Sequence, residues 1–125
     1  METITGLSVT VVAAKKYRFY TQLFITDDNT QSYAKIAIGG TATATAFVGR
    51  VRSEDADGSI DASATITAID EVFTTVSEAG HVVTITGVIT VNAGGTLTVE
   101  MAQDTSHATA VSVLVGSHFE VVEIP

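Results

Sequence analysis

The sequence contains no cysteine, and its single proline, Pro125, is the last residue. Without cysteine, neither a disulfide nor a cysteine-based zinc site can stabilise the fold. Proline cannot donate a hydrogen bond to a sheet, so its absence before position 125 leaves every candidate strand uninterrupted. Threonine and glycine break each apolar run before it reaches membrane-spanning length, and we therefore expect no membrane insertion.

Positive charge is also scarce. Six lysines and arginines stand against 14 aspartates and glutamates, which gives a formal net charge of −8. Proteins that bind nucleic acids or anionic membrane surfaces present clusters of basic side chains. The basic residues here are Lys15, Lys16, Arg18, Lys35, Arg50 and Arg52, the last two alternating along one expected strand. Nucleic acid and membrane lipid are therefore not expected as partners.

Aromatic residues make up only 6% of the chain although 46% of it is hydrophobic, so its apolar content is mainly valine, alanine and isoleucine. β-Branched side chains suit a pleated surface and lose rotamer freedom in a helix, so this composition favours strands. A chain of 125 residues is long enough for one domain with its own hydrophobic core. We therefore expect a single all-β domain over residues 1–125.

Alternation of apolar and polar residues locates the strands. In residues 17–25 the odd-numbered side chains share one largely apolar face. Similar patterns predict strands at residues 7–11, 33–38, 41–52, 60–69, 72–76, 82–91, 96–103 and, as a closing pair, 113–124. Polar turns separate them at intervals of about 8–12 residues, which is typical of a β-sandwich or barrel with roughly eight to ten antiparallel strands. A helix would fit only within residues 70–80, and none is predicted there.

Two adjoining segments yield more detailed expectations. The alternation in residues 41–52 predicts that the threonines lie on one face of the strand and the alanines on the other. Residues 53–59 form the most polar stretch of the chain, and we expect them to make a surface loop.

Four stretches of the sequence carry a resemblance to a known family. Residues 88–103 read VITVNAGGTLTVEMAQ, residues 115–124 read VGSHFEVVEI, and the segments YRF at 17–19 and KIAIGGTA at 35–42 fit the same pattern. Together they resemble phage and prophage tail-associated jelly-roll domains, which are similar in architecture to the heads of C1q and tumour necrosis factor. The resemblance implies a jelly-roll β-sandwich that assembles as a homotrimeric head on a virion or extracellular surface.

Adjacent apolar residues independently favour assembly. In the pairs Val11-Val12, Val82-Val83 and Val121-Val122, one side chain of each pair must point away from the core. Exposed contiguous apolar surface usually marks an interface, and a closed three-fold ring would bury it. The side chains expected at the trimer interface are Tyr17, Phe19, Tyr20, Phe24, Val83, Phe119 and Val121.

An acidic segment is the best candidate for a ligand site. Asp55, Asp57, Ser59 and Asp61 place hard oxygen atoms at every second position around Gly58, as in part of a calcium-binding loop. The segment lacks the distal glutamate and the flanking helices of an EF-hand. The competing interpretation, which we favour, is a solvated turn between strands, and calcium is the only cofactor that the sequence suggests.

Residue patterns typical of catalysis are not found. His81, His107 and His118 show no metal-ligand spacing. The neighbours in Ser106-His107 and Ser117-His118 would point to opposite faces of a strand, so they cannot form a nucleophile–base pair there. We therefore expect a non-enzymatic protein, and a small hydrolase is the weaker alternative.

Recognition of a cell-surface glycan or protein receptor is assigned to the polar loops. The residues expected to contribute are Asp27, Asp28, Asn29, Glu54, Asp104 and His107. The principal alternative function is a carbohydrate-binding β-sandwich module. In that case Tyr17, Tyr20 or Tyr33 would stack on a sugar, although aromatic residues in this position more often anchor a core or an interface.

Overall fold

The computed structural model describes residues 1–26, 33–55, 58–75, 81–103 and 112–125. The strands within these ranges are β1 (Glu2–Val11), β2 (Lys16–Thr26), β3 (Ala34–Gly39), β4 (Thr43–Glu54), β5 (Ile60–Ile66), β6 (Phe73–Thr74), β7 (His81–Ala93), β8 (Gly95–Gln103), β9 (Ser112–Val113) and β10 (His118–Ile124). No helix occurs in the described residues. The predicted all-β class is confirmed, as is the closing pair of strands, here β9 and β10.

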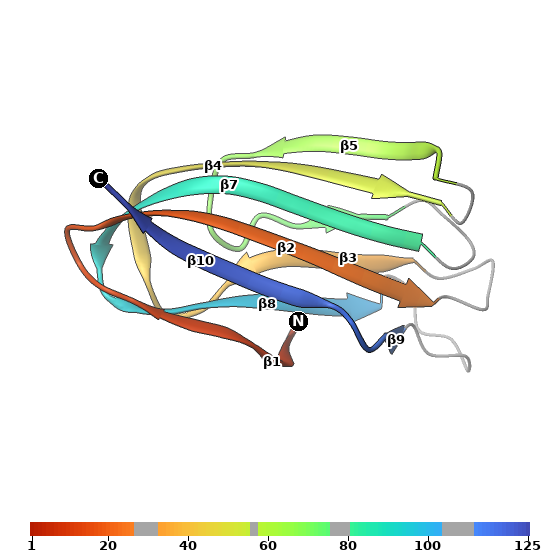
Figure 1. Cartoon of the computed structure of the whole chain (residues 1–125), viewed down its shortest axis with the longest axis horizontal. Coiled ribbons are helices and arrows are strands. Elements are labelled where there is room, and N and C mark those ends of the chain that lie inside the picture. The colour runs from red at the N-terminus through yellow and green to blue at the C-terminus, as the bar shows by residue number, and fades with distance from the viewer. Residues whose placement is uncertain (27–32, 56–57, 76–80, 104–111) are drawn as a thin grey trace.

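The strands form two antiparallel sheets that pack as a β-sandwich (Figure 1). The four-stranded sheet has the order β1-β8-β3-β6, and the six-stranded sheet has the order β10-β2-β7-β4-β5. In the second sheet, β9 pairs with β2 beyond the end of β10, so β9 and β10 follow the same edge. Although β1 and β10 come from opposite ends of the chain, they contact each other at one side of the sandwich.

The core fills the space between the two sheets. Phe19 and Leu23 from β2 are fully buried, as the alternation in residues 17–25 predicts. Ile38 from β3 and Leu97 from β8 meet them from the four-stranded sheet and are also fully buried. Burial of each such side chain contributes about 1.5–3 kcal/mol relative to leaving it in water.

Two glycines, Gly49 in β4 and Gly87 in β7, lie directly opposite each other within the six-stranded sheet. The ring of Phe19 fills the space beside Gly87 and stacks on the ring of Phe47, with the two ring centroids 5.2 Å apart. A Cβ atom at Gly87 would overlap the Phe19 ring and the carbonyl oxygen of Val48. Glycine is therefore required at position 87 to leave room for the stacked aromatic pair.

The predicted division of residues 41–52 into a threonine face and an alanine face holds as far as Thr45 and fails at Ala46. The three threonines are exposed, whereas Ala42 is buried and Ala44 is partly buried. The pairing of β4 with β7 skips Thr45 on one strand and Asn92 on the other, so each strand carries a bulge. A bulge shifts the phase of the alternation by one residue. As a result Phe47 is buried, whereas Ala46 is exposed like Thr45.

The predicted loop at residues 53–59 begins later than expected. β4 continues to Glu54, and Ser53 is fully buried where it pairs with Val83 of β7. The Ser53 hydroxyl makes no hydrogen bond within the described part of the chain. At the far end of this hairpin, β5 ends at Ile66, earlier than predicted. Polarity alone therefore misplaced the start of the loop, because a sheet can bury an isolated serine, whereas β5 begins at Ile60 as predicted.

Candidate functional site

In its described part, the acidic segment between β4 and β5 folds as a hairpin turn. The Asp55 amide donates to the Ser59 carbonyl (2.9 Å), and the Gly58 amide donates to the Asp55 carbonyl (3.0 Å). The Oδ1 atom of Asp55 accepts a hydrogen bond of 3.2 Å from the Ser59 amide. Asp57 and the side chain of Asp61 lie outside the described residues. Asp55 and Ser59 thus stabilise the turn, and calcium binding by the four residues stays a prediction.

The other predicted recognition residues are described only in part. Those outside the described residues are Asp27, Asp28, Asn29, Asp104 and His107. Glu54 is described, and its Oε1 atom lies 3.4 Å from Nε of Arg52 in an exposed ion pair. The His118 ring lies against that of Tyr20, with centroids 5.6 Å apart, whereas the side chain of His81 is not described. Among the described side chains, no group of three acids or histidines is placed to hold a metal ion.

Three of the side chains expected at a trimer interface belong instead to the core of one chain. Phe19 and Val83 are fully buried between the sheets, and Tyr17 is nearly so. The Tyr17 hydroxyl accepts a hydrogen bond of 3.0 Å from the Val12 amide, which anchors it inside the sandwich. The expectation is therefore corrected for these three residues, because they have no surface to offer a partner.

The other four expected interface residues retain exposed surface. Tyr20 and Phe24 alternate with the buried residues of β2, so they face outward from the six-stranded sheet. Phe119 and Val121 pair with inward-facing positions of β2 and pack against the core. They remain partly exposed because β10 is an edge strand. The sequence shows that both strand faces are apolar but not which face the second sheet covers.

A hollow lies where the edges of the two sheets meet. On one side the pairing of β1 with β8 shifts register between Thr3 and Ser8, around Gly6, whose φ is +85°. On the other side is the turn that joins β9 to β10. The hollow has a volume of about 430 Å³, and we call the surface around it the seam. It is lined by Ile4, Thr5, Leu7, Val113, Leu114, Val115, Gly116 and Ser117.

The turn between β9 and β10 is held to β2 by hydrogen bonds. The Phe24 amide donates to Oγ of Ser117 (2.9 Å), which in turn donates to the Leu114 carbonyl (2.9 Å). The Leu114 amide donates to the Phe24 carbonyl (2.7 Å). Gly116 has a φ of +101°, which allows the chain to reverse. These bonds fix Val115 at the tip of the turn, where its exposed fraction is 103%.

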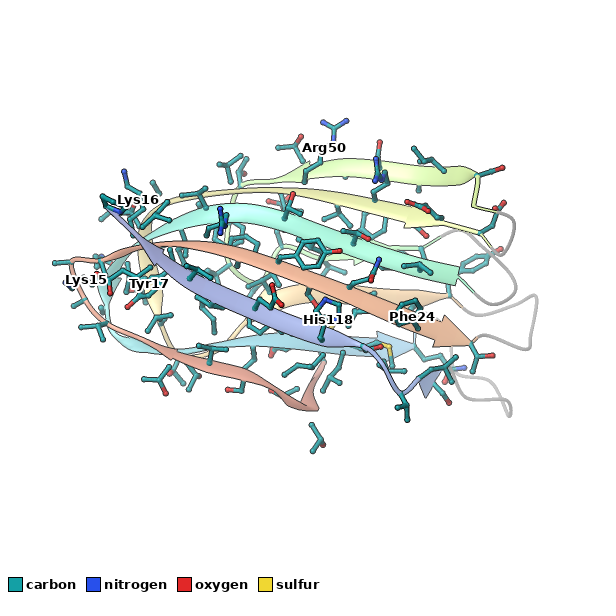
Figure 2. The ribbon with its side chains drawn as sticks, viewed as in Figure 1. Lys15, Lys16, Tyr17, Phe24, Arg50 and His118 are labelled. Atoms are coloured by element: carbon teal, nitrogen blue, oxygen red, sulfur yellow. The ribbon has the colours of Figure 1, made fainter. Side chains whose placement is uncertain are left out.

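The outer face of the six-stranded sheet carries a second feature that sequence reasoning missed. Strand register aligns two rows across β10-β2-β7-β4-β5: Glu120, Tyr20, Thr86, Arg50 and Thr65, and beside them His118, Gln22, Thr84, Arg52 and Ser63. Figure 2 shows the Arg50 side chain projecting away from the sheet. A shallow hollow of about 270 Å³ on this face is lined by Arg50, Arg52, Ile60, Ser63, Thr84 and Thr86.

The sequence predicts only part of the composition of this outer face. Arg50 and Arg52 alternate along β4, which predicts that they share a face. Their neighbours Thr84 and Thr86 belong to β7, more than thirty positions further along the chain. Which residues lie beside the arginines is therefore decided by strand pairing.

Comparison with known protein families, curated proteins and solved structures gives no match for this chain. In the part of the chain that the structure describes, no helix has the length and apolar character needed to cross a membrane. The class of protein that the structure defines is therefore an all-β sandwich, and its function has to be inferred from its surfaces.

Proposed function

We propose that this chain is a non-enzymatic structural module that assembles as a homotrimer through the seam. The observation that carries the proposal is an exposed apolar turn beside a hollow that is lined by apolar side chains together with Thr5 and Ser117. Val115 projects fully into solvent and Leu114 is 47% exposed, while Ile4 and Leu7 line the hollow next to them. Contiguous exposed apolar surface usually marks an interface. If each turn enters the hollow of the next chain, three identical contacts close a ring.

We further propose that the sandwich is a jelly roll. The strand pairing is nested along the chain, since β1 pairs with β8, β2 with β7, β3 with β6, and β4 with β5. Such nesting supports a long antiparallel ribbon that is rolled into two sheets, which is the jelly-roll arrangement of capsid and lectin domains. The added strands β9 and β10 then extend the edge that carries the seam.

The hydrogen bonds of two polar residues support a structural role. Ser117, which precedes a histidine, uses its hydroxyl both to accept from the Phe24 amide and to donate to the Leu114 carbonyl. Asp55 uses its carboxylate to close the turn between β4 and β5. Both side chains stabilise main-chain turns, which suits an assembling module better than a reacting site.

The biological setting of the proposal rests on sequence resemblance. Residues 88–103 and 115–124 resemble phage tail-associated jelly-roll domains, so we place the trimer in a tail or fibre head on a virion or extracellular surface. In such a head the seam would hold the chains together, and outward surfaces would meet a receptor.

The experiment that tests the proposal is the absolute mass of the protein, measured by light scattering during size exclusion. We expect the mass of three chains for the unaltered protein. Val115→Asp should give the mass of one chain, because a carboxylate at the tip of the turn cannot enter a hollow lined mainly by apolar side chains without a large desolvation cost. Circular dichroism of the variant should remain that of a folded β-protein.

Val72→Asp provides the matched control. Val72 is also an exposed valine, at 47%, but it precedes β6 and is not among the residues that line the seam. This variant should keep the mass of the unaltered protein. A monomeric unaltered protein would overturn the trimer, and a Val115→Asp variant that keeps its mass would remove the seam from the interface.

A further inference from the structure

The outer face of the six-stranded sheet has a charge opposite to that of the whole chain. The chain has a net charge of −8, yet four of its six basic residues, Lys16, Arg18, Arg50 and Arg52, occupy outward-facing positions of β2 and β4. At physiological ionic strength, charges more than about 8 Å apart are largely screened from one another. The described acids on this face are Glu54, which pairs with Arg52, and Glu120 on β10, which lies three strands from Arg50 in the same row. A ligand beside Arg50 therefore experiences mainly positive charge.

The two central arginines differ in how they are already engaged. Arg52 faces Glu54, with 3.4 Å between Nε and Oε1. Arg50 reaches only the Thr65 hydroxyl, at 3.4 Å, and forms no ion pair within the described residues. A guanidinium group presents donors in a planar fork that matches a carboxylate. Arg50 is thus available for an external carboxylate, and Arg52 lies two positions along the same strand, about 7 Å away.

Uncharged polar side chains lie beside this pair on both neighbouring strands, and the exposed Ile60 completes the lining of the hollow. Thr84 and Thr86 line the hollow with the arginines, and Ser63 borders it on β5. Hydroxyl groups both donate and accept hydrogen bonds, as sugar hydroxyls do. Beyond Thr86 on the same face lies Tyr20, whose ring is tilted against that of His118. Rings on a flat polar surface offer an apolar face to a sugar ring.

We propose that this outer face binds a polysaccharide with one carboxylate on each sugar. Arg50 and Arg52 would pair with the carboxylates, while the hydroxyl rows would bond to the sugar hydroxyls. The centre of a protein–protein interface is usually depleted in charged residues, whereas the centre of this face carries two arginines. Nucleic acid carries a dense line of phosphates and needs a more extensive basic surface than four side chains in an acidic protein.

The proposed site is independent of the seam. The six residues that line the hollow on the outer face belong to β4, β5 and β7, whereas the seam is lined by β1, β9 and the turn that follows β9. A monomeric Val115→Asp variant should therefore bind the polysaccharide through the same arginines. Failure of the trimer proposal and failure of this one can be told apart.

The test is affinity electrophoresis in native gels that contain alginate, with neutral dextran, dextran sulfate or single-stranded DNA in parallel gels. Alginate should retard the unaltered protein, and neutral dextran should not. The double variant Arg50→Gln/Arg52→Gln should lose about tenfold or more in affinity, because it removes the charge-assisted hydrogen bonds to the carboxylates. Tyr20 lies on the same face but further from the arginine pair. Tyr20→Ala should also weaken retardation by alginate.

Lys15→Gln/Lys35→Gln is the control for net charge, since it removes two positive charges outside the outer face. It should be retarded by alginate as strongly as the unaltered protein once its mobility without ligand is subtracted. No retardation by alginate, or an equal loss in the control variant, would overturn the proposal. Retardation by dextran sulfate alone would assign the face to sulfated chains, and retardation by DNA alone would assign it to nucleic acid. Either result would overturn the proposal of a polysaccharide with one carboxylate on each sugar.

Discussion

At the scale of single residues, the packing of the core depends on two glycines. Gly49 and Gly87 face each other in adjacent strands and let the Phe19 ring stack on Phe47. Glycine inside a strand is unfavourable by itself, so its presence marks a close approach. Sequence analysis placed both glycines in strands but assigned them no role, because the ring that occupies their space comes from β2.

Substitution at Gly87 tests this packing. Gly87→Ala should destabilise the fold by about 1–3 kcal/mol or more, because the added Cβ overlaps both the Phe19 ring and main-chain atoms of β4. The measurement is the midpoint of urea unfolding followed by circular dichroism. Gly49→Ala is the matched control, since its Cβ would lie 3.0 Å from a flexible Ile66 side chain, and it should cost less. Equal midpoints for the two variants would argue against the ring as the cause.

At the scale of elements, the edge formed by β9 and β10 is held by side-chain hydrogen bonds as well as by strand pairing. Thr21 donates from Oγ1 to the His118 carbonyl (2.7 Å), where β10 begins. Ser117 fixes the preceding turn against Phe24. The sequence predicted a closing pair of strands here but not their partner, because β2 lies almost a hundred positions earlier in the chain.

Ser117→Ala tests the turn as an element. The variant leaves the Phe24 amide without its acceptor, so we expect a loss of about 1 kcal/mol and faster hydrogen exchange at that amide. Ser112→Ala is the control, because Ser112 lies exposed in β9 on the same edge. Unchanged exchange at Phe24 in Ser117→Ala would show that the hydroxyl does not hold the turn.

At the scale of the whole molecule, the two outward surfaces serve different purposes in our proposals. The seam is an apolar edge suited to contact between copies, and the outer face is a polar surface suited to a solvated ligand. Only Tyr20 and Phe24 of the expected interface residues lie on that outer face. The trimer contact that we propose is therefore formed by the turn around Val115 and not by the side chains first expected at the interface. The pairing of β9 with β2 places this turn at the edge of the sheet.

Assembly through the seam predicts that stability depends on concentration. A partner chain that binds only the folded state raises the unfolding temperature as chain concentration increases. Over a range of about 100-fold in concentration, the midpoint by differential scanning fluorimetry should rise for the unaltered protein and stay constant for Val115→Asp. A constant midpoint in both proteins would speak against coupled folding and assembly.

The sequence by itself determined the all-β class, most strand positions and the buried face of β2, because these follow from local alternation and β-branched composition. Only the tertiary structure decided which apolar face lies in the core in other strands, as Val83 of β7 shows. It also decided where bulges reverse the alternation, as at Thr45, and which side chains surround Arg50. The physical reason is that strand pairing joins residues far apart in the chain, whereas period-two alternation reports only on neighbours.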